Sequence, residues 1–405
     1  MTVEEKPNRD RITQVRFSGL RTAADIVLDC EPMTVLIGPN GVGKSTLIEG
    51  LELLRKLSLG PEFLRALNDD HGGAAWLLRR NTSELKLGAD ISDGQSVLSY
   101  DIVLARRNGS FVTQSESLRI EGDPVYVRDG DTIVGSSEAG SALPSGTIYT
   151  KWPLLSMLLA ASPTAARAVN ALAGIEVHVP FATQARWFGP GAAPERTMRG
   201  DAIVQSTDRL DRGGANLANA VHELRNRHDW ADTLETIRLV IDEDIIDVTT
   251  PASASGGSIG LSVTYRTSGS IPAFALSDGT LALLGLIAIA RLDGGESTRS
   301  LLVMDEPELH LHPGAIGQIV ALLEECSAKH PVVIATHSDR LLDSLSDPAS
   351  ATVLCDLDER RSLQLRRPDK PQLERWLAEY RGIGQLRAEG YDKLVFPTPK
   401  TANNG

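Results

Sequence analysis

The chain has 405 residues, of which 41% are hydrophobic and 23% charged, the proportions of an ordinary globular protein and not of a disordered chain. Its net charge of −12 disfavours tight, non-specific DNA binding by the monomer, although a local basic groove completed by a dimer stays open. Aromatic residues make up 4% of the chain, which argues against a surface that stacks bases.

The cysteines and the apolar runs of the sequence indicate in which cellular compartment the protein is expected. The three cysteines are scattered and form neither a disulfide framework nor a zinc knuckle. Residues 1–11 are charged and carry no signal core. The longest apolar run, residues 281–290, is about half as long as a bilayer requires. We therefore expect a soluble cytoplasmic protein without a membrane partner.

The first predicted elements surround a glycine-rich loop. Residues 11–17 and 24–28 have the pattern of two strands around a short turn. The apolar run 33–37 predicts a buried parallel strand. A helix is expected over about 45–57, where apolar residues recur at helical spacing until Gly60-Pro61 stops it.

An inserted region follows this helix. From 84 to about 133 the pattern changes to period two, with a hairpin signal at Asn108-Gly109, which predicts an antiparallel sheet. A loop is expected at 189–200 and helices at 216–227 and 230–242, and no heptad or internal repeat indicates a coiled-coil arm. The expected parts are 1–133 (first half of the core with the antiparallel sheet), 134–258 (an inserted, mainly helical lobe) and 259–405 (second half of the core).

The loop after the strand 33–37 fits the phosphate-binding pattern of Gly, four residues and Gly-Lys-Ser. A strand, a glycine loop and a helix N-terminus together form an anion site from backbone N–H groups and the helix dipole. This arrangement predicts that the protein binds a nucleoside triphosphate. The residues expected to hold it are Gly38, Pro39, Asn40, Gly41, Val42, Gly43, Lys44, Ser45 and Thr46.

Two further apolar strands end in polar side chains. Residues 301–306 form a Walker B pattern, a hydrophobic parallel strand that carries Asp305 and Glu306 to the edge beside the phosphates. Asp305 would hold Mg²⁺ through water, Ser45 would supply a hydroxyl ligand, and Glu306 would polarise the attacking water. The alternative is a strand that merely ends in solvated acids. The strand 331–335 leads to His337, which can reach the γ-phosphate side of the same site.

A fourth motif precedes the apolar helix expected at 281–291. Ser277, with Gly279, can cap this helix and offer free N–H groups to an anion. An ordinary capped core helix would have the same pattern.

These four motifs, in this order, resemble the ABC-class ATPases of the SMC, RecF and OLD (overcoming lysogenization defect) kind. More narrowly, the chain looks like the stand-alone bacterial AAA family ATPases related to the OLD ATPase domain, because Asp305-Glu306-Pro307-Glu308-Leu309-His310-Leu311-His312-Pro313 is similar to that group's Walker B string. The tail at 376–391 resembles the group's terminal helix and turn. The resemblance covers 11–57 and 270–391 and is thin across 60–260.

The resemblance implies an α/β P-loop NTPase of the ABC, RecF and SMC-head type, with a mixed core sheet flanked by helices, an antiparallel β subdomain and an inserted helical lobe. It implies ATP and Mg²⁺ as cofactors. Lys44 would neutralise the β- and γ-phosphates, Ser45 and Asp305 would organise Mg²⁺, Glu306 would act as general base and His337 as the switch residue.

Ser277 and Gly279 would reach ATP held by a second protomer, which implies an ATP-sandwiched homodimer or a higher homo-oligomer. Ser-Asp-Gly-Thr at 277–280 departs from the transporter signature Ser-Gly-Gly-Gln and weakens the interpretation as a transporter. Gln114 is a candidate for the glutamine loop and thus for a metal ligand, although a surface strand residue is an alternative.

Other polar residues in the matched regions have structural interpretations. We expect His310 and His312 to be structural or dimer-facing, since two histidines without a placed carboxylate make a weak zinc site. OLD proteins often carry a Toprim nuclease domain with an Asp-x-Asp at a strand end, and Asp356 and Asp358 have this spacing. Too few residues follow for that domain, so we expect 356–359 to belong to the last core strand and hairpin.

The leading functional hypothesis is a slow Mg²⁺-dependent ATPase that acts as a nucleotide-driven dimerisation switch. By family analogy it would serve bacterial anti-phage defence beside a separately encoded effector such as a nuclease. One alternative is a DNA-repair or chromosome-maintenance ATPase of the RecF or SMC kind with duplex DNA as partner. A second alternative is a scaffold that binds ATP and hydrolyses it little.

Overall fold

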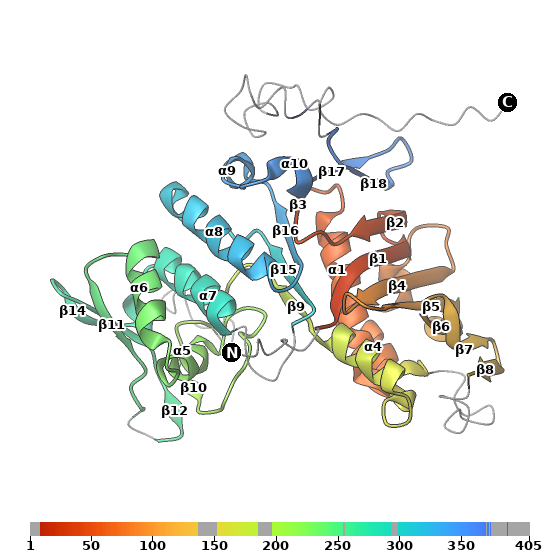
Figure 1. Ribbon diagram of the computed structural model, residues 1–405, viewed down its shortest axis with the longest axis horizontal. Helices are drawn as coiled ribbons and strands as arrows, with labels where there is room; N and C mark the ends of the chain where they lie inside the picture. Colours follow the sequence, from red (N-terminus) through yellow and green to blue (C-terminus); the bar gives the residue numbers. More distant parts are fainter. Residues whose placement is uncertain are drawn as a thin grey trace, which may run out of the picture.

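The computed structural model of the protein describes residues 9–136, 152–184, 197–253, 256–292 and 299–369, together with Pro371, Leu373 and Arg387. Apart from Arg387, the predicted tail element at 376–391 lies outside these residues, as does most of the predicted loop 189–200. A central sheet stands in the middle, with a second sheet on one side and a lobe of helices and short strands on the other (Figure 1).

Six strands form the central sheet: β3 (Met33–Ile37), β9 (Ile175–His178), β15 (Leu301–Asp305), β16 (Val332–Thr336), β17 (Thr352–Leu357) and β18 (Leu363–Arg366). Their order is β18-β17-β3-β16-β15-β9, and only β18 runs antiparallel. Both faces of this sheet are covered, because Leu36 packs in one hydrophobic core and its neighbours Val35 and Ile37 pack in the other. Burial on both faces explains the continuous apolar runs of the sequence.

The second sheet is antiparallel throughout, as the period-two pattern predicted. It contains β1 (Arg11–Leu20), β2 (Ala23–Asp29), β4 (Glu84–Ser92), β5 (Val97–Arg107), β6 (Ser110–Ile120), β7 (Asp123–Asp129) and β8 (Thr132–Gly135), in the order β2-β1-β4-β5-β6-β7-β8. Helix α1 (Lys44–Lys56) lies between the two sheets and contacts strands of both. Gly50 permits this contact, since a Cβ there would lie 2.8 Å from Cε1 of Phe17.

The second lobe packs on the other face of the central sheet. It contains α5 (Leu217–Arg225), α6 (Trp230–Val240), α7 (Asp278–Leu292), α8 (Ile316–Ser327), β10 (Ala202–Ile203), β11 (Ile245–Thr249), β12 (Ser258–Ile259), β13 (Ser262–Tyr265) and β14 (Gly269–Pro272). Helix α7 contacts α5, α6 and α8. A helix surrounded in this way is apolar on all sides, as its sequence is from Leu281 to Ala290.

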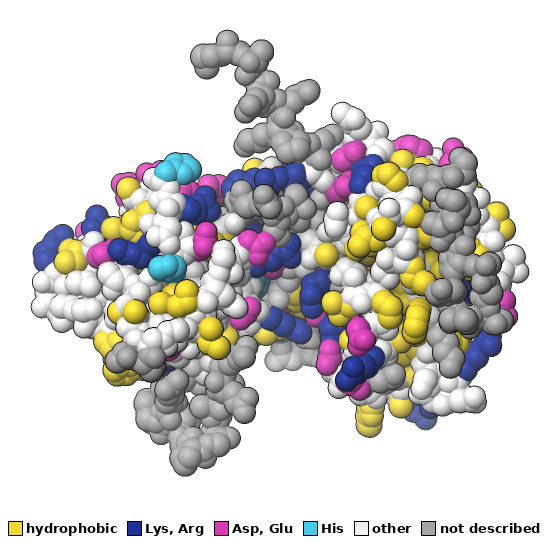
Figure 2. Space-filling model, turned by 90° about the horizontal axis from the view of Figure 1, so that it is seen from below, with side chains coloured by type: hydrophobic (Ala, Val, Ile, Leu, Met, Phe, Trp, Pro, Cys, Tyr) yellow, Lys and Arg dark blue, Asp and Glu magenta, His cyan; other side chains and the backbone are white. Residues whose placement is uncertain are grey.

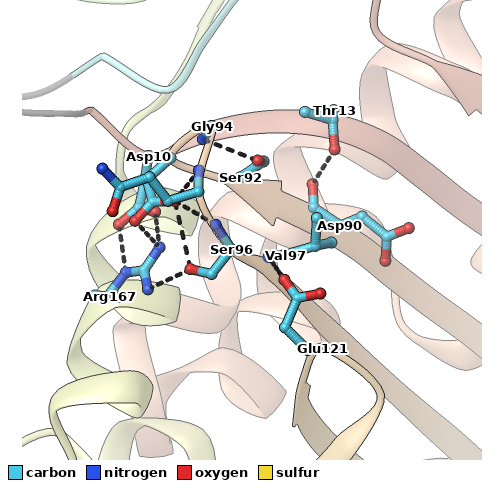
Figure 3. A network of polar contacts seen from close by, with 11 residues as sticks. Asp10, Thr13, Asp90, Ser92, Gly94, Ser96, Val97, Glu121 and Arg167 are labelled. Atoms are coloured by element: carbon cyan, nitrogen blue, oxygen red, sulfur yellow. Dashed lines mark hydrogen bonds and ion pairs between the residues drawn. The ribbon is translucent and has the colours of Figure 1, made fainter.

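A polar network attaches helix α4 (Pro163–Ala173) to the antiparallel sheet (Figure 3). Nη2 of Arg167 lies 2.6 Å from Oδ1 of Asp10 and 2.9 Å from Oδ2 of Asp93. Nη1 donates to Oγ of Ser96 at 3.0 Å. One guanidinium therefore joins α4, the residue before β1 and the turn between β4 and β5.

The remaining elements are short. They are η1 (Leu57–Glu62), α2 (Phe63–His71), α3 (Ala74–Leu77), η3 (Leu155–Leu158), η5 (Ala273–Ala275), η6 (Pro313–Ala315), α9 (Asp339–Asp343) and α10 (Pro348–Ala351). Among the described helices, none combines the length and the hydropathy that crossing a membrane would need.

Candidate nucleotide site

Three loops meet at the carboxyl edge of the central sheet. Strand β16 lies between β3 and β15, so the residues that end or follow these three parallel strands emerge side by side. They enclose a cavity of about 240 Å³. Its lining residues are Thr22, Asn40, Gly41, Gly43, Lys44, Ser45, Thr46, Asp305, Glu306 and His337.

Two glycines of the P-loop stand at positions where a larger side chain would be strained or would clash with neighbouring atoms. Gly43 precedes α1 at a φ of 115°, and a Cβ there would lie 2.3 Å from Oγ1 of Thr22. A Cβ on Gly38 would lie 2.3 Å from the carbonyl oxygen of Cys355 on β17. Gly38, Pro39 and Val42 belong to the loop without lining the cavity, and Val42 is buried below it in the core.

Lys44 turns its ammonium group back over the loop. Nζ donates to the carbonyl oxygens of Gly38, at 2.7 Å, and Pro39, at 3.2 Å. It also lies 2.9 Å from Nε2 of His337. Burial lowers the pKa of Lys44, while the charges of Glu306 and Asp305 oppose that change. A phosphate group would be a further anionic partner for this cation.

Asp305 and Ser45 supply a donor set that suits Mg²⁺. Both line the cavity, and within the described part of the chain the Asp305 carboxylate makes no hydrogen bond or ion pair. Burial and the adjacent charge of Glu306 raise the pKa of Asp305 to about 6. A carboxylate and a hydroxyl that line one cavity offer the oxygen ligands that Mg²⁺ prefers, so these residues fit the ion.

Glu306 directly follows β15, the predicted Walker B strand, and its backbone bonds to the neighbouring strand β16. Its φ is 48°, a conformation that a non-glycine residue adopts only when its surroundings enforce it. Its backbone N–H donates to the carbonyl oxygen of Ala335 at 2.8 Å. Oε1 of Glu306 lies 3.4 Å from Nε2 of His337, and about a third of each side chain is exposed. The carboxylate is therefore held at the cavity and accessible to water.

Glu308 links the same loop to the end of β16. Oγ1 of Thr336 donates to Oε1 of Glu308, and it accepts a hydrogen bond from the backbone N–H of Ser338 at 2.9 Å. Burial raises the pKa of Glu308, and the bond from Thr336 opposes that change. These contacts hold the peptide on both sides of His337.

One family model matches this chain. The model described as "AAA domain, putative AbiEii toxin, Type IV TA system" matches residues 33–115 and 159–343, which is more than half of the chain. The chain belongs to this AAA-domain family. The match includes the P-loop, Asp305, Glu306 and His337. The resemblance to AAA family ATPases that the sequence motifs indicated is therefore confirmed.

A solved structure confirms the predicted fold. The chain is similar to an Smc head domain with an extended coiled coil, bound to the C-terminal domain of ScpA, from Pyrococcus furiosus, with a TM-score of 0.50, 11% identity and coverage of 91% of this chain and 99% of that one. An SmcHead bound to the C-winged helix domain of ScpA has a TM-score of 0.49, 12% identity and coverage of 88% and 96%. At these identities the likeness concerns the fold alone. No curated protein sequence matches the chain.

Ser277 and Gly279, the residues of the predicted signature segment, lie apart from the cavity of their own chain. Ser277 is exposed before α7, and its Oγ accepts a hydrogen bond from the backbone N–H of Thr280 at 3.0 Å, so it caps the helix as expected. A Cβ on Gly279 would lie 3.0 Å from the carbonyl oxygen of His310. Neither Ser277 nor Gly279 lines the cavity around Lys44.

Arg199, which no sequence signal singled out, holds this signature segment. It is 7% exposed, and Nη1 donates to the carbonyl oxygens of Phe274, at 3.1 Å, and Leu276, at 2.7 Å. Nη2 bonds Oδ1 of Asp278 at 2.6 Å. Thr22, at the β1–β2 turn, lines the cavity, and the sequence motifs missed it as well.

The structure does not bring Gln114 to the cavity. Gln114 lies at an irregularity in the β5–β6 pairing, and its Nε2 donates to Oε1 of Glu84 at 3.1 Å. Gln114 is not among the residues that line the cavity around Lys44. The proposed role of Gln114 as a metal ligand is therefore withdrawn.

The other polar residues of the matched regions have local contacts. Nδ1 of His312 accepts a hydrogen bond from the backbone N–H of Gly314 at 3.1 Å, and His310 is exposed with a φ of 68°. Asp356 bonds Arg366 across the β17–β18 hairpin at 2.6 Å. Asp358 accepts the backbone N–H of Ser362 at 2.7 Å in its turn. Residues 356–359 thus belong to the last core strand and hairpin, as expected.

Proposed function

We propose that this chain is a slow Mg²⁺-dependent ATPase in which a second copy of the chain completes the nucleotide site. The observation that carries the proposal is the convergence of the P-loop, Asp305, Glu306 and His337 on one cavity of about 240 Å³. Membership of a P-loop ATPase family supports ATP as the ligand. A phosphate chain on the loop would accept bonds from its backbone N–H groups and from Lys44.

Each side chain at the cavity has one role in the proposed reaction. Lys44 exchanges loop carbonyls for phosphate oxygens, and Ser45 and Asp305 hold Mg²⁺. When bound, Mg²⁺ supplies positive charge against the phosphate oxygens. Glu306 accepts a proton from the attacking water, and His337, 3.4 Å from Glu306, orients that carboxylate and the γ-phosphate. Catalysis here depends on positioning and charge, so an incomplete site turns over slowly.

The place of the signature segment supports the proposed homodimer. Ser277 is exposed and outside the cavity of its own chain, and it stands at the N-terminus of a buried fifteen-residue helix, α7. In an ATP-bound pair, the start of α7 in each copy would meet the phosphates held by the other. ATP then favours the closed pair, and hydrolysis releases it.

The biological role proposed is bacterial defence, with a separately encoded effector. The family description names a putative AbiEii toxin and a type IV toxin–antitoxin system, which supports this setting. Purification of the tagged chain from its native host should recover the product of a neighbouring gene. Stimulation of turnover by duplex DNA at low salt, with no such partner, would favour chromosome maintenance instead.

The decisive variant is Glu306→Gln, which keeps the shape of the side chain and removes its basicity. We expect turnover to fall by roughly 100-fold or more, the effect of losing a general base. The variant should accumulate as an ATP-bound dimer in light scattering after size exclusion. Glu235→Gln, on an exposed position of α6, is the matched control. Turnover that survives in Glu306→Gln would refute the role of Glu306, and a monomer with saturating ATP would refute the composite site.

A further inference from the structure

A second cavity, of about 360 Å³, adjoins the nucleotide cavity and shares Ser45, Thr46 and Asp305 with it. These are the hydroxyl residues after the P-loop lysine and the acid of the Walker B strand. Phosphates held by the P-loop therefore border both cavities. The second cavity is otherwise lined by Arg21, Ile48, Glu49, Glu52, Asp70, His71, Val179 and Arg212.

Almost every charge in this second cavity has a partner. Glu49 bonds Arg21 at 2.7 Å and His71 at 2.8 Å. In the same way, Glu52 bonds Arg55 at 2.7 Å and Asp70 bonds Lys56 at 2.6 Å.

Arg212 is the exception among these cations. It is exposed, and in the part of the chain that the structure describes it makes no hydrogen bond or ion pair. It lines the same cavity as Asp305. Basic side chains also gather on the surface between the two lobes (Figure 2).

The backbone around Arg212 is fixed. Gly214, at a φ of 80°, donates its N–H to the carbonyl oxygen of Asp211 at 2.8 Å and closes a tight turn. Asn216, which is 5% exposed, accepts the N–H of Asp211 at 2.7 Å and donates to the carbonyl oxygen of Arg209 at 2.9 Å. Arg212 therefore projects from a preformed turn.

This turn joins the nucleotide site to the second lobe. The carbonyl oxygen of Gly213 accepts the N–H of Ala182 at 3.0 Å, four residues after β9 ends. Strand β9 pairs with β15, where His178 is the partner of Met304, the residue before Asp305. On its other side the turn leads directly into α5, which packs on α7, the helix that starts at the signature segment.

We infer that Arg212 bonds a phosphate oxygen of the nucleotide held by the P-loop and so reports nucleotide occupancy to α5 and the second lobe. A guanidinium group binds phosphate oxygens through paired, charge-assisted hydrogen bonds, and the Arg212 guanidinium, at the cavity that Asp305 also lines, has its donors available for them. This inference rests on the proposed function, because it needs a nucleotide in the cavity around Lys44.

The test compares Arg212→Ala, Arg212→Lys and the control Arg107→Ala, an exposed arginine at the end of β5. Arg212 makes no hydrogen bond or ion pair within the described chain, so these variants should fold, which thermal melts will verify. Calorimetric titration with MgATP at low salt should show affinity lost roughly 10- to 100-fold in Arg212→Ala, the range for a charge-assisted hydrogen bond. Arg212→Lys should lie between Arg212→Ala and the wild type, and Arg107→Ala should match the wild type.

Hydrogen exchange supplies a readout that a merely structural role would not move. MgATP should slow amide exchange in α5 of the wild type and of Arg107→Ala, but not of Arg212→Ala measured at matched occupancy. Affinity within twofold of the wild type in Arg212→Ala, together with unchanged protection of α5, would overturn the inference. If the wild type itself binds no MgATP, or binds it equally well as Lys44→Ala, the proposed function fails instead.

Discussion

Nζ of Lys44 lies 2.9 Å from Nε2 of His337, although 293 positions separate the two residues in the chain. The same nitrogen of His337 lies 3.4 Å from Oε1 of Glu306. Cation, imidazole and carboxylate thus form one row across the carboxyl ends of β3, β16 and β15. The row exists because β16 lies between β3 and β15 in the central sheet.

His337→Ala should lower kcat while leaving ATP affinity nearly unchanged. His337 contacts Glu306 and Lys44, whereas the phosphates gain most of their bonds from the loop and Lys44. We expect kcat to fall roughly 10- to 100-fold and the Kd for ATP to change less than about threefold. Single-turnover kinetics and calorimetric titration measure the two effects, with the exposed His312→Ala as control. A large loss of affinity at constant kcat would contradict this role.

Asp305→Asn should raise the Mg²⁺ concentration needed for turnover. The amide has one neutral oxygen where the carboxylate offers charge to the cation, and Ser45 alone is a weak ligand. A Mg²⁺ titration at fixed ATP should shift to a midpoint roughly tenfold higher or more. Asp356→Asn is the matched control, since Asp356 also lies on a parallel strand of the central sheet but bonds Arg366. An unchanged midpoint in Asp305→Asn would exclude Asp305 as a metal residue.

Thr336→Val should destabilise the end of β16 more than Thr336→Ser, which keeps the hydroxyl and loses one buried methyl group. Thr336 is fully buried, and its hydroxyl both donates to Glu308 and accepts from Ser338. Valine leaves both partners unsatisfied, which costs about 1–3 kcal/mol. Urea unfolding measures the difference in the free energy of unfolding. Equal stability of the two variants would mean that the hydroxyl does not hold the segment around His337.

Glu176→Gln should destabilise the protein at pH 7 more than at pH 3. Burial alone would raise the pKa of Glu176, but the charge of Arg299 and the bond from His178 lower it from 4.5 to about 2. A depressed folded-state pKa stabilises the fold above pH 4.5, and this contribution is lost as the pH falls towards 2. At pH 7 it amounts to about 3 kcal/mol. Urea unfolding at pH 7, 5 and 3 should show that the free energies of unfolding of the variant and the wild type become more alike as the pH falls. A difference that stays constant with pH would refute the lowered pKa of Glu176.

Arg167→Ala should lower stability without changing the kinetics of the site. The guanidinium joins α4 to Asp10, Asp93 and Ser96, which are partly exposed and do not line the nucleotide cavity (Figure 3). Loss of this network should cost about 1–2 kcal/mol, since partly exposed ion pairs contribute little individually. Arg167→Lys retains the positive charge but lacks the several N–H donors of a guanidinium group. It should recover less than half of the stability that Arg167→Ala loses. Thermal melts check stability, and an altered kcat would show that α4 reaches the nucleotide site.

Local patterns of the sequence determined the parts of the site that are continuous in the chain. The P-loop lies between an apolar strand and an amphipathic helix, and its glycines are needed because the backbone there turns and packs closely, as at Gly43. The apolar run before Asp305 is also a local pattern. A parallel strand is apolar while both faces of the sheet are buried, and polar residues begin where the strand reaches solvent. These features follow from spacing and residue type alone.

Only the tertiary structure decided which strand ends are neighbours. The order β3-β16-β15-β9 places His337 in the middle and leaves Gln114, on the other sheet, outside. Arg199 carries no motif, because its role comes from the carbonyl groups and the carboxylate that another segment brings to it. Hydrogen bonds and charge contacts between residues far apart in the chain leave no periodic trace in a sequence, so the fold had to supply them.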